Sequence, residues 1–241
     1  MWYKRPMADP GEPDETPEEH PSPAPTPADL LTQEPRSKGE KTRRRILELA
    51  IQRFGERGYR RTSVSEIARA AGLTQAAVYA YFAGKDELFA AAVDADAELA
   101  IQSVRAQLEG IPAAQLFPAF LLFAIPALDQ HPLVKRILSG SEREVLPRLL
   151  DLPALRRLTD WIAERLRQGQ LTGEIRLDLD CETVAAGAEA VLLSLLMAVT
   201  QVGGSYHYER QLGVVSLFDT LVRPCPDATA PAAGASAFSS L

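Results

Sequence analysis

The sequence predicts an all-α protein in two folded parts: a small N-terminal three-helix domain and a larger helical domain, with disordered termini. Its 241 residues are 46% hydrophobic and 24% charged, which is typical of a soluble globular chain. Apolar residues recur at helical spacing, with no convincing alternating pattern of the kind that marks β-strands. The positive charge is concentrated in one block near the N-terminal side.

Both ends of the chain have compositions that disfavour a packed core. Residues 1–36 hold nine of the eighteen prolines, many acidic residues and no apolar periodicity, and residues 224–241 are rich in Ala, Ser and Pro. Such segments bury too little apolar surface to offset the entropy lost on ordering. We therefore expect disordered tails at 1–36 and 224–241, a first domain at 37–84 and a second at 85–223.

The first domain should open with a helix that starts at Ser37, because Ser37 and Glu40 have the spacing of a capping box. Its buried face is expected to hold Ile46, Leu47, Ala50 and Phe54, and Gly55 and Gly58 are expected to mark its end.

Two short helices should follow, joined by a tight turn. Ser63 and Glu66 form a second capping box, and Gly72 suits the left-handed turn that ends this helix. Thr74 should cap a third helix that runs to about residue 81 or 82, and Lys85 should begin a long fourth helix. This order of elements predicts a helix-turn-helix.

The charge distribution indicates an anionic partner for the first domain. Residues 41–90 hold ten basic and five acidic side chains, whereas the segments before and after carry net charges of −5 and −6. Lys41, Arg43, Arg44 and Arg45 lie in the first turns of the first helix, where cations oppose the helix dipole. A nucleic-acid duplex would explain why they lie there.

The third helix has a face suited to a DNA groove. At 100° per residue, Val78 and Phe82 point to the core, whereas Gln75, Ala76, Tyr79 and Ala80 point outward or to the margin. Small residues allow close approach, Gln pairs with an adenine edge or a phosphate, and Tyr79 and Tyr81 offer hydroxyl donors.

Residues 42–88 resemble the DNA-binding domain of the TetR family of transcriptional regulators. The landmarks that carry this resemblance are Ile46, Ala50, Phe54, Gly58-Tyr59, Thr62-Ser63-Val64, Ile67-Ala68, Ala71-Gly72-Leu73-Thr74, Tyr79, Tyr81-Phe82, Lys85 and Leu88. They cover about a fifth of the chain. The resemblance implies a dimeric regulator, most often a repressor, that binds a palindromic operator in double-stranded DNA.

The resemblance also implies which residues touch DNA, at the backbone and the major-groove edges: Thr62, Ser63, Thr74, Gln75, Ala76, Tyr79, Tyr81 and Lys85. The charge pattern adds Arg43 and Arg44. Ala76 stands where Gly is also frequent in the family, and Gln75 is the best candidate for direct base reading. Ala77 and Ala80 leave few other base-reading side chains.

Helices are expected in the second domain at about 111–128, 132–148, 152–169, 180–202 and 207–223. The resemblance implies that this domain senses a small-molecule effector and that helices 180–202 and 207–223 pair with their copies in a homodimer. Phe117, Phe120, Phe123 and Trp161 are candidates for an apolar ligand pocket, with packed core as the alternative. Uncharged residues 110–128 are long enough to raise a membrane span, but three prolines favour buried helices and no membrane.

Several functional classes find no support in the sequence. Three scattered histidines and two distant cysteines give neither a metal site nor a disulfide framework, and no P-loop, GxSxG or HExxH is present. We therefore expect no catalytic residue and no cofactor. The N-terminus lacks a secretory pattern, so we expect a cytoplasmic protein. The alternatives are a DNA-binding regulator controlled by a protein partner and, less favoured, an enzyme with a helical domain.

Overall fold

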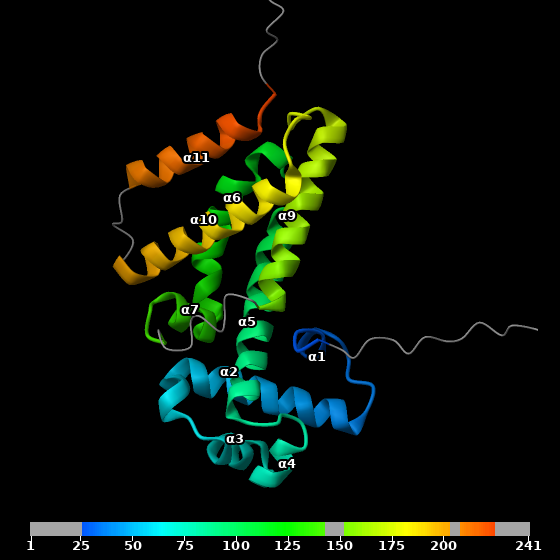
Figure 1. The fold of residues 1–241 in the computed structure, drawn as a ribbon. Helices are drawn as coiled ribbons and strands as arrows, with labels where there is room; N and C mark the ends of the chain where they lie inside the picture. Colours follow the sequence, from blue (N-terminus) through cyan, green and yellow to red (C-terminus); the bar gives the residue numbers. More distant parts are fainter. Residues whose placement is uncertain (1–25, 143–151, 203–207, 225–241) are drawn as a thin grey trace, which may run out of the picture.

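The structure is a computed structural model that describes residues 26–142, 152–202 and 208–224. Across these ranges the chain forms helices and no strand (Figure 1). The helices are α1 (Asp29–Thr32), α2 (Lys38–Arg61), α3 (Val64–Ala71), α4 (Gln75–Tyr79), α5 (Lys85–Gln107), η1 (Ala113–Gln115), α6 (Leu116–Ala127), η2 (Leu128–Gln130), α7 (Pro132–Leu138), α9 (Pro153–Thr172), α10 (Cys181–Val202) and α11 (Tyr208–Val222).

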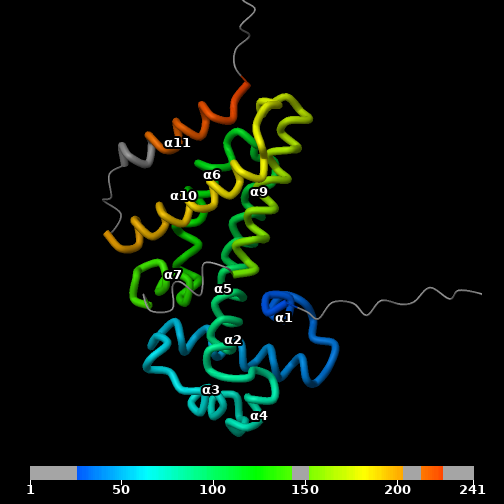
Figure 2. The backbone as a smooth tube through the Cα atoms, in the orientation of Figure 1, coloured from blue at the N-terminus to red at the C-terminus, as the bar shows by residue number. Residues whose placement is uncertain are grey.

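Helices α2, α3 and α4 form one end of the molecule, and α5 leads from this end into a larger bundle (Figure 2). In that bundle α5 and α10 each pack against both α6 and α9, and α11 lies at the end farthest from α3 and α4. The all-α prediction, with an N-terminal helix-turn-helix followed by a larger helical part, is therefore confirmed.

The predicted end of the first helix is confirmed at Gly58 and wrong at Gly55. The helical conformation runs through Gly55 and breaks at Gly58, where φ is 83°, and a further helical turn carries α2 to Arg61. Gly55 stays helical and lies close to Pro132 of α7, where an added Cβ would be 3.1 Å from the proline Cβ. The glycine thus permits close packing of α7 on α2, and it does not end the helix.

Part of the segment predicted to be disordered is ordered. Within the range 1–36, residues 26–36 are described, and α1 lies among them. The Asp29 carboxylate accepts hydrogen bonds from the Thr26 backbone N–H at 2.9 Å and from its hydroxyl at 2.6 Å. Leu30 is buried, and α1 contacts α2. Composition missed this anchor because it depends on a surface that α2 provides. The rest of the expected tails, 1–25 and 225–241, lies outside the described residues.

The described residues bury two hydrophobic cores. One lies in the α6, α9 and α10 bundle, and the other lies beneath α2, α3 and α4. The second core does not stop at residue 84, because it includes Leu88 and Val93 of α5 and Leu133 and Ile137 of α7. The first half of α5 and one side of α7 therefore pack as part of the N-terminal end, whereas Leu138 of α7 lies in the bundle core.

Two stretches are long and apolar enough to cross a membrane by length and composition, Ala113–Gln130 and Cys181–Val202. The first consists of η1, α6 and η2, and it buries Phe117, Phe120 and Ala124 in the bundle core. The 3₁₀ turns η1 and η2 flank α6 within this stretch, and α6 runs unbroken with Pro126 near its end. Helix α10 buries one side, which includes Ala185 and Leu192. In this fold both stretches pack as helices of the bundle.

Candidate nucleic-acid interface and ligand cavities

The residues from which α3 was predicted, Ser63, Glu66 and Gly72, cap its two ends. The Ser63 hydroxyl accepts the Glu66 backbone N–H at 3.2 Å, and the Glu66 carboxylate accepts the Ser63 N–H at 3.1 Å. This hydrogen bond from the Ser63 backbone lowers the pKa of Glu66 below its ordinary value. At the other end, Gly72 adopts φ of 72° and terminates the helix. The turn to α4 is therefore tightly defined.

Helix α4 presents the outward face that its sequence predicts. Thr74 caps it by accepting the Ala77 N–H at 3.2 Å, and Val78 is fully buried beneath it. Gln75 donates from Nε2 to the Tyr79 hydroxyl at 2.8 Å, and Tyr79 is 44% exposed. Ala76 is also exposed. An amide, a phenol and a methyl group thus form one free surface at this end of the molecule.

Thr62 departs from the expectation that it contacts DNA. Its side chain is buried, and its hydroxyl lies 2.9 Å from the Gly58 carbonyl oxygen and 3.1 Å from that of Arg53. Both carbonyls belong to the region where α2 is broken at Gly58. The hydroxyl therefore satisfies backbone acceptors, and the side chain is not available to a partner.

Lys85 is held at the start of α5 by Tyr59, a residue that sequence reasoning did not select as part of the site. The Lys85 ammonium lies 4.3 Å from the centre of the Tyr59 ring, and the Tyr59 hydroxyl donates to Asp86. Tyr59 also packs edge-on against Phe89 at 5.0 Å. Tyr81 is half-buried beside the same core. The available sequence signal was the Gly58-Tyr59 pair, which is one of the landmarks of the family resemblance.

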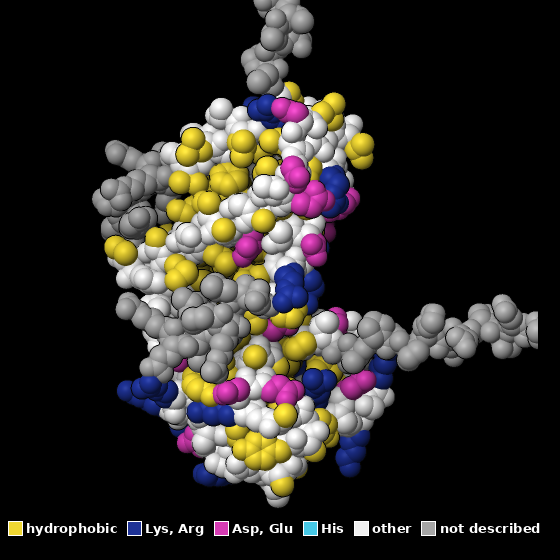
Figure 3. Space-filling model, viewed as in Figure 1, with side chains coloured by type: hydrophobic (Ala, Val, Ile, Leu, Met, Phe, Trp, Pro, Cys, Tyr) yellow, Lys and Arg dark blue, Asp and Glu magenta, His cyan; other side chains and the backbone are white. Residues whose placement is uncertain are grey.

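Of the two predicted arginines, Arg44 is paired and Arg43 packs against the core. Arg44 donates to Glu48 at 2.9 Å on the same helix. The Arg43 guanidinium lies 5.3 Å from the centre of the Phe82 ring, which places it where α2 meets the end of α4. Dark blue Lys and Arg side chains are spaced around this end of the molecule (Figure 3). The structure thus places Arg43 beside the end of α4, whereas Arg44 pairs along α2 and Thr62 is turned inward.

Three buried acidic residues of α5 tie it to the bundle, and sequence reasoning did not identify them. Asp96 accepts the N–H groups of Leu133 and Val134 at 3.1 and 3.0 Å, at the start of α7, and lies 2.8 Å from His131. Asp94 accepts the Ala154 N–H at 2.8 Å, at the start of α9.

Glu98 completes this set by pairing with α9, where it accepts from Arg157 Nε at 2.6 Å. Three acids spaced two residues apart in an apolar helix were the available signal. The pattern does not reveal that the acids have partners far along the chain.

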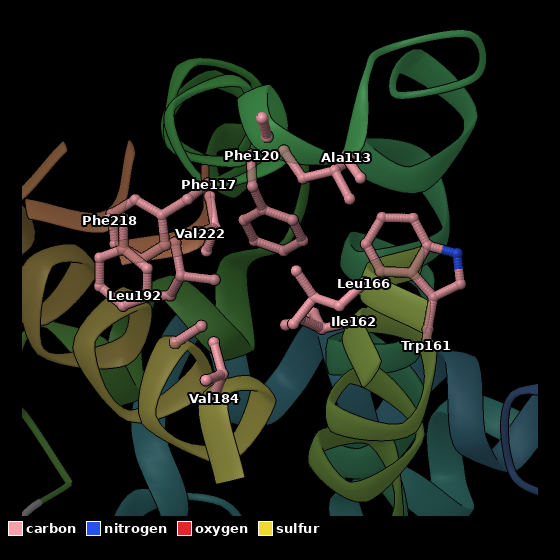
Figure 4. A pocket seen from close by; sticks show the side chains of 13 residues that line it. Ala113, Phe117, Phe120, Trp161, Ile162, Leu166, Val184, Leu192, Phe218 and Val222 are labelled. Atoms are coloured by element: carbon pink, nitrogen blue, oxygen red, sulfur yellow. The ribbon is translucent and has the colours of Figure 1, made fainter. Parts of the chain in front are cut away.

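An apolar cavity of about 40 Å³ gathers three of the four predicted pocket residues (Figure 4). Phe117 and Phe120 of α6 and Trp161 of α9 line it, and the Phe117 ring stacks on Phe218 of α11 at 3.9 Å between centres. Phe123 does not line this cavity and packs instead against the bundle core, so the structure does not group it with the other three. Among the residues that the structure describes, no group of three His, Cys, Asp or Glu is placed to hold a metal ion.

Comparison with known proteins finds a family match at the N-terminal end of the fold and likenesses to individual regulators over more of the chain. Residues 46–92 match the family described as bacterial regulatory proteins, tetR family. The regulator UidR of Escherichia coli strain K12 is 26% identical over 145 residues, which cover 60% of this chain and 74% of UidR. The regulator SrpR of Pseudomonas putida is 27% identical over 177 residues, 66% of this chain and 76% of SrpR.

Solved structures extend the likeness to both parts of the fold. Salmonella enterica GusR superposes with a TM-score of 0.58 at 24% identity, covering 78% of this chain and 98% of GusR. The fatty acid degradation regulator FadR of Bacillus halodurans gives 0.56 at 17% identity, covering 78% and 96%. At these identities the likeness establishes the fold. The likeness to the tetR family of bacterial regulatory proteins is carried by residues 46–92, which extend from α2 into α5.

Proposed function

We propose that the protein is a sequence-specific DNA-binding regulator of transcription, acting as a dimeric repressor that a small ligand releases from its operator. The observation that carries the proposal is the exposed face of α4. Gln75, Ala76 and Tyr79 are exposed to solvent on this face, and Val78 is buried in the core on the opposite side of the helix. This face lies inside the segment that matches the family. Base reading by Gln75 and phosphate contacts by Ser63, Thr74, Tyr81 and Lys85 follow from their positions around it.

A homodimer would explain the apolar surface of α10 and α11. Val202 is 66% exposed and Leu217 is 71% exposed, and hydrophobic side chains gather over these helices in the space-filling view (Figure 3). Exposed patches of this kind mark protein interfaces. A two-fold dimer would present two α4 helices about one DNA turn apart, roughly 34 Å, and would select a palindromic site.

The release step is assigned to α5, which connects the DNA-facing end to the bundle. A ligand in the bundle would favour an arrangement in which the two α4 helices no longer match successive grooves. It acts only to the extent that it binds that arrangement more tightly. We also assign the protein to the cytoplasm, where its operator would lie.

The test is binding-site selection from random duplex DNA with four proteins: wild type, Gln75→Ala, Tyr79→Phe and the matched control Gln168→Ala. Gln168 is an exposed glutamine of α9, far from α4. We expect wild type and the control to enrich one palindrome. Gln75→Ala should relax selection at one position in each half-site, and Tyr79→Phe should weaken binding to all sequences about equally.

Two results would contradict the proposal. One is the absence of any enriched sequence at low salt from a protein that is folded and dimeric. The other is enrichment that Gln75→Ala and Tyr79→Phe leave unchanged, because DNA would then be read by a surface other than α4.

A further inference from the structure

A second cavity lies on the side of the bundle nearer the DNA-facing end. It has a volume of about 410 Å³, within the range of pockets that hold drug-sized ligands. Val93 of α5, Ile137 of α7 and Leu155 of α9 line it, together with Leu193 and Met197 of α10. Its walls are almost wholly apolar.

One carboxylate stands in this apolar wall, that of Glu189 on α10. It is half-buried, and no other ionisable side chain among the described residues lines the cavity. Burial raises the pKa of Glu189 above its ordinary value, and no charge on a described residue offsets this loss of hydration. The other polar lining side chain, Ser194, donates its hydroxyl to the Ala190 carbonyl at 2.8 Å.

Glu189 lacks the hydrogen-bond partners that the buried acids of α5 have. Asp94, Asp96 and Glu98 of α5 each accept from a backbone N–H or a cationic side chain. Glu189 has no hydrogen bond or ion pair with any described residue. A half-buried carboxylate with no partner among the described residues has lost part of its hydration, so a cationic group bound in the cavity would stabilise its charged form.

We propose that this cavity binds an organic cation, an amine or quaternary ammonium carried on an apolar body, with the Glu189 carboxylate as its counter-ion. The apolar body would occupy the space between α5, α7 and α10, and the cationic group would lie against α10. This inference rests on the proposed function, because it names the chemical class of the effector.

The position of the cavity suits an effector site. Its wall residues Val93 and Ile137 also belong to the hydrophobic core beneath α2, α3 and α4. An occupant would therefore press on side chains that pack the DNA-facing end. The smaller cavity at Phe117 and Trp161 has no charged lining residue and borders the far end of the bundle.

The experiment compares two probes of the same shape, 4-phenylbutylammonium and its neutral counterpart pentylbenzene. Calorimetry measures their binding to the full-length protein without DNA. We expect wild type to bind the cation about ten- to a hundredfold more tightly than the hydrocarbon. Glu189→Gln should abolish that preference and leave pentylbenzene affinity within about threefold.

Two further variants control for charge and for location. Glu182→Gln removes a carboxylate of the same helix that is exposed and lies outside the cavity, and it should keep the preference. Leu193→Trp should fill the cavity and weaken both probes by at least about tenfold. Circular dichroism and the dimer dissociation constant show that each variant is folded and assembled.

Several outcomes would overturn the inference: no binding of either probe to folded wild type, a cation preference that survives Glu189→Gln, or unchanged affinity in Leu193→Trp. So would a Glu189→Gln protein whose only change is a weaker dimer, because Glu189 would then pair across subunits. Operator binding is measured separately. If the cation binds at Glu189 and operator affinity does not change, the site stands and the release step of the proposed function fails.

Discussion

At the scale of single residues, a side chain that matches the family pattern for DNA contacts can have a purely structural role. Thr62 matches the family pattern for a DNA contact, yet its hydroxyl serves the carbonyls of Gly58 and Arg53 inside the fold. Tyr59 lies outside the predicted set and holds Lys85 in place through its ring. Chemistry alone does not distinguish such roles, since burial decides which groups remain free to bind a partner.

Thr62→Val should therefore lower stability without removing a DNA contact. It keeps the shape of the side chain but leaves a buried acceptor unsatisfied, which costs about 1–3 kcal/mol. Urea unfolding should show that loss, whereas Thr42→Val, which removes a more exposed bond to the Lys38 carbonyl, should cost less than about 0.5 kcal/mol. A loss of operator affinity in Thr62→Val with stability unchanged would restore the direct DNA role.

Glu189 should make stability fall as pH rises. Its pKa is raised in the folded protein, so the folded state retains a proton that the unfolded chain releases from about pH 4 upward. Relative to wild type, Glu189→Gln should thus gain stability between about pH 4 and pH 7.

Glu182 provides a control of opposite sign for this prediction. Its hydrogen bond from Arg167 lowers its pKa, so its contribution is present above the ordinary value and is lost in acid. Glu182→Gln should lose stability relative to wild type over the same rise in pH. Urea unfolding at a series of pH values measures both effects. If the free energies of unfolding of the two variants changed in parallel with pH, the raised pKa of Glu189 would be contradicted.

At the scale of elements, two glycines with similar backbone angles should respond differently to the same change. Gly58 and Gly72 have φ of 83° and 72°. A Cβ on Gly72 would meet nothing within 4 Å, whereas one on Gly58 would collide with Glu142 and lie 2.6 Å from Arg136 Nη2.

Gly72→Ala should therefore cost only backbone strain, about 1 kcal/mol, and Gly58→Ala should cost more, up to roughly 3 kcal/mol. Thermal or urea unfolding of the two variants measures the difference. Equal losses would mean that Arg136 and Glu142 move aside freely and that the break in α2 is not held by its neighbours.

The elements also show what local sequence can predict. The caps at Ser63 and Thr74 and the helix end at Gly72 form as expected. Each of them depends only on residues up to four positions away from it. The roles of Asp94 and Asp96 depend on helix starts about 35 to 60 residues later, which no local pattern encodes. The same reasoning separates Phe123 from the cavity, because its place depends on how α6 packs against distant helices.

At the scale of the whole molecule, the N-terminal core depends on a residue of α7, which follows α6 in the chain. Leu133 of α7 is fully buried in it. Leu133→Ala should cost about 2–5 kcal/mol. Hydrogen exchange should quicken at α2 and α3 amides, although the change lies more than 60 residues away in sequence. If exchange quickened only in α7 and its bundle neighbours, the two ends would unfold independently.

The shared core limits how such regulators can be recombined. A chimera joined at residue 84 would give a new DNA-reading end without the Leu88, Val93, Leu133 and Ile137 side chains that complete its interior. The exchange would have to carry α7 as well, which the chain reaches only after all of α6 and η2. Because the unit that packs together is discontinuous along the chain, a single crossover cannot transfer it. The DNA-facing end and the bundle are thus expected to change in sequence together during evolution.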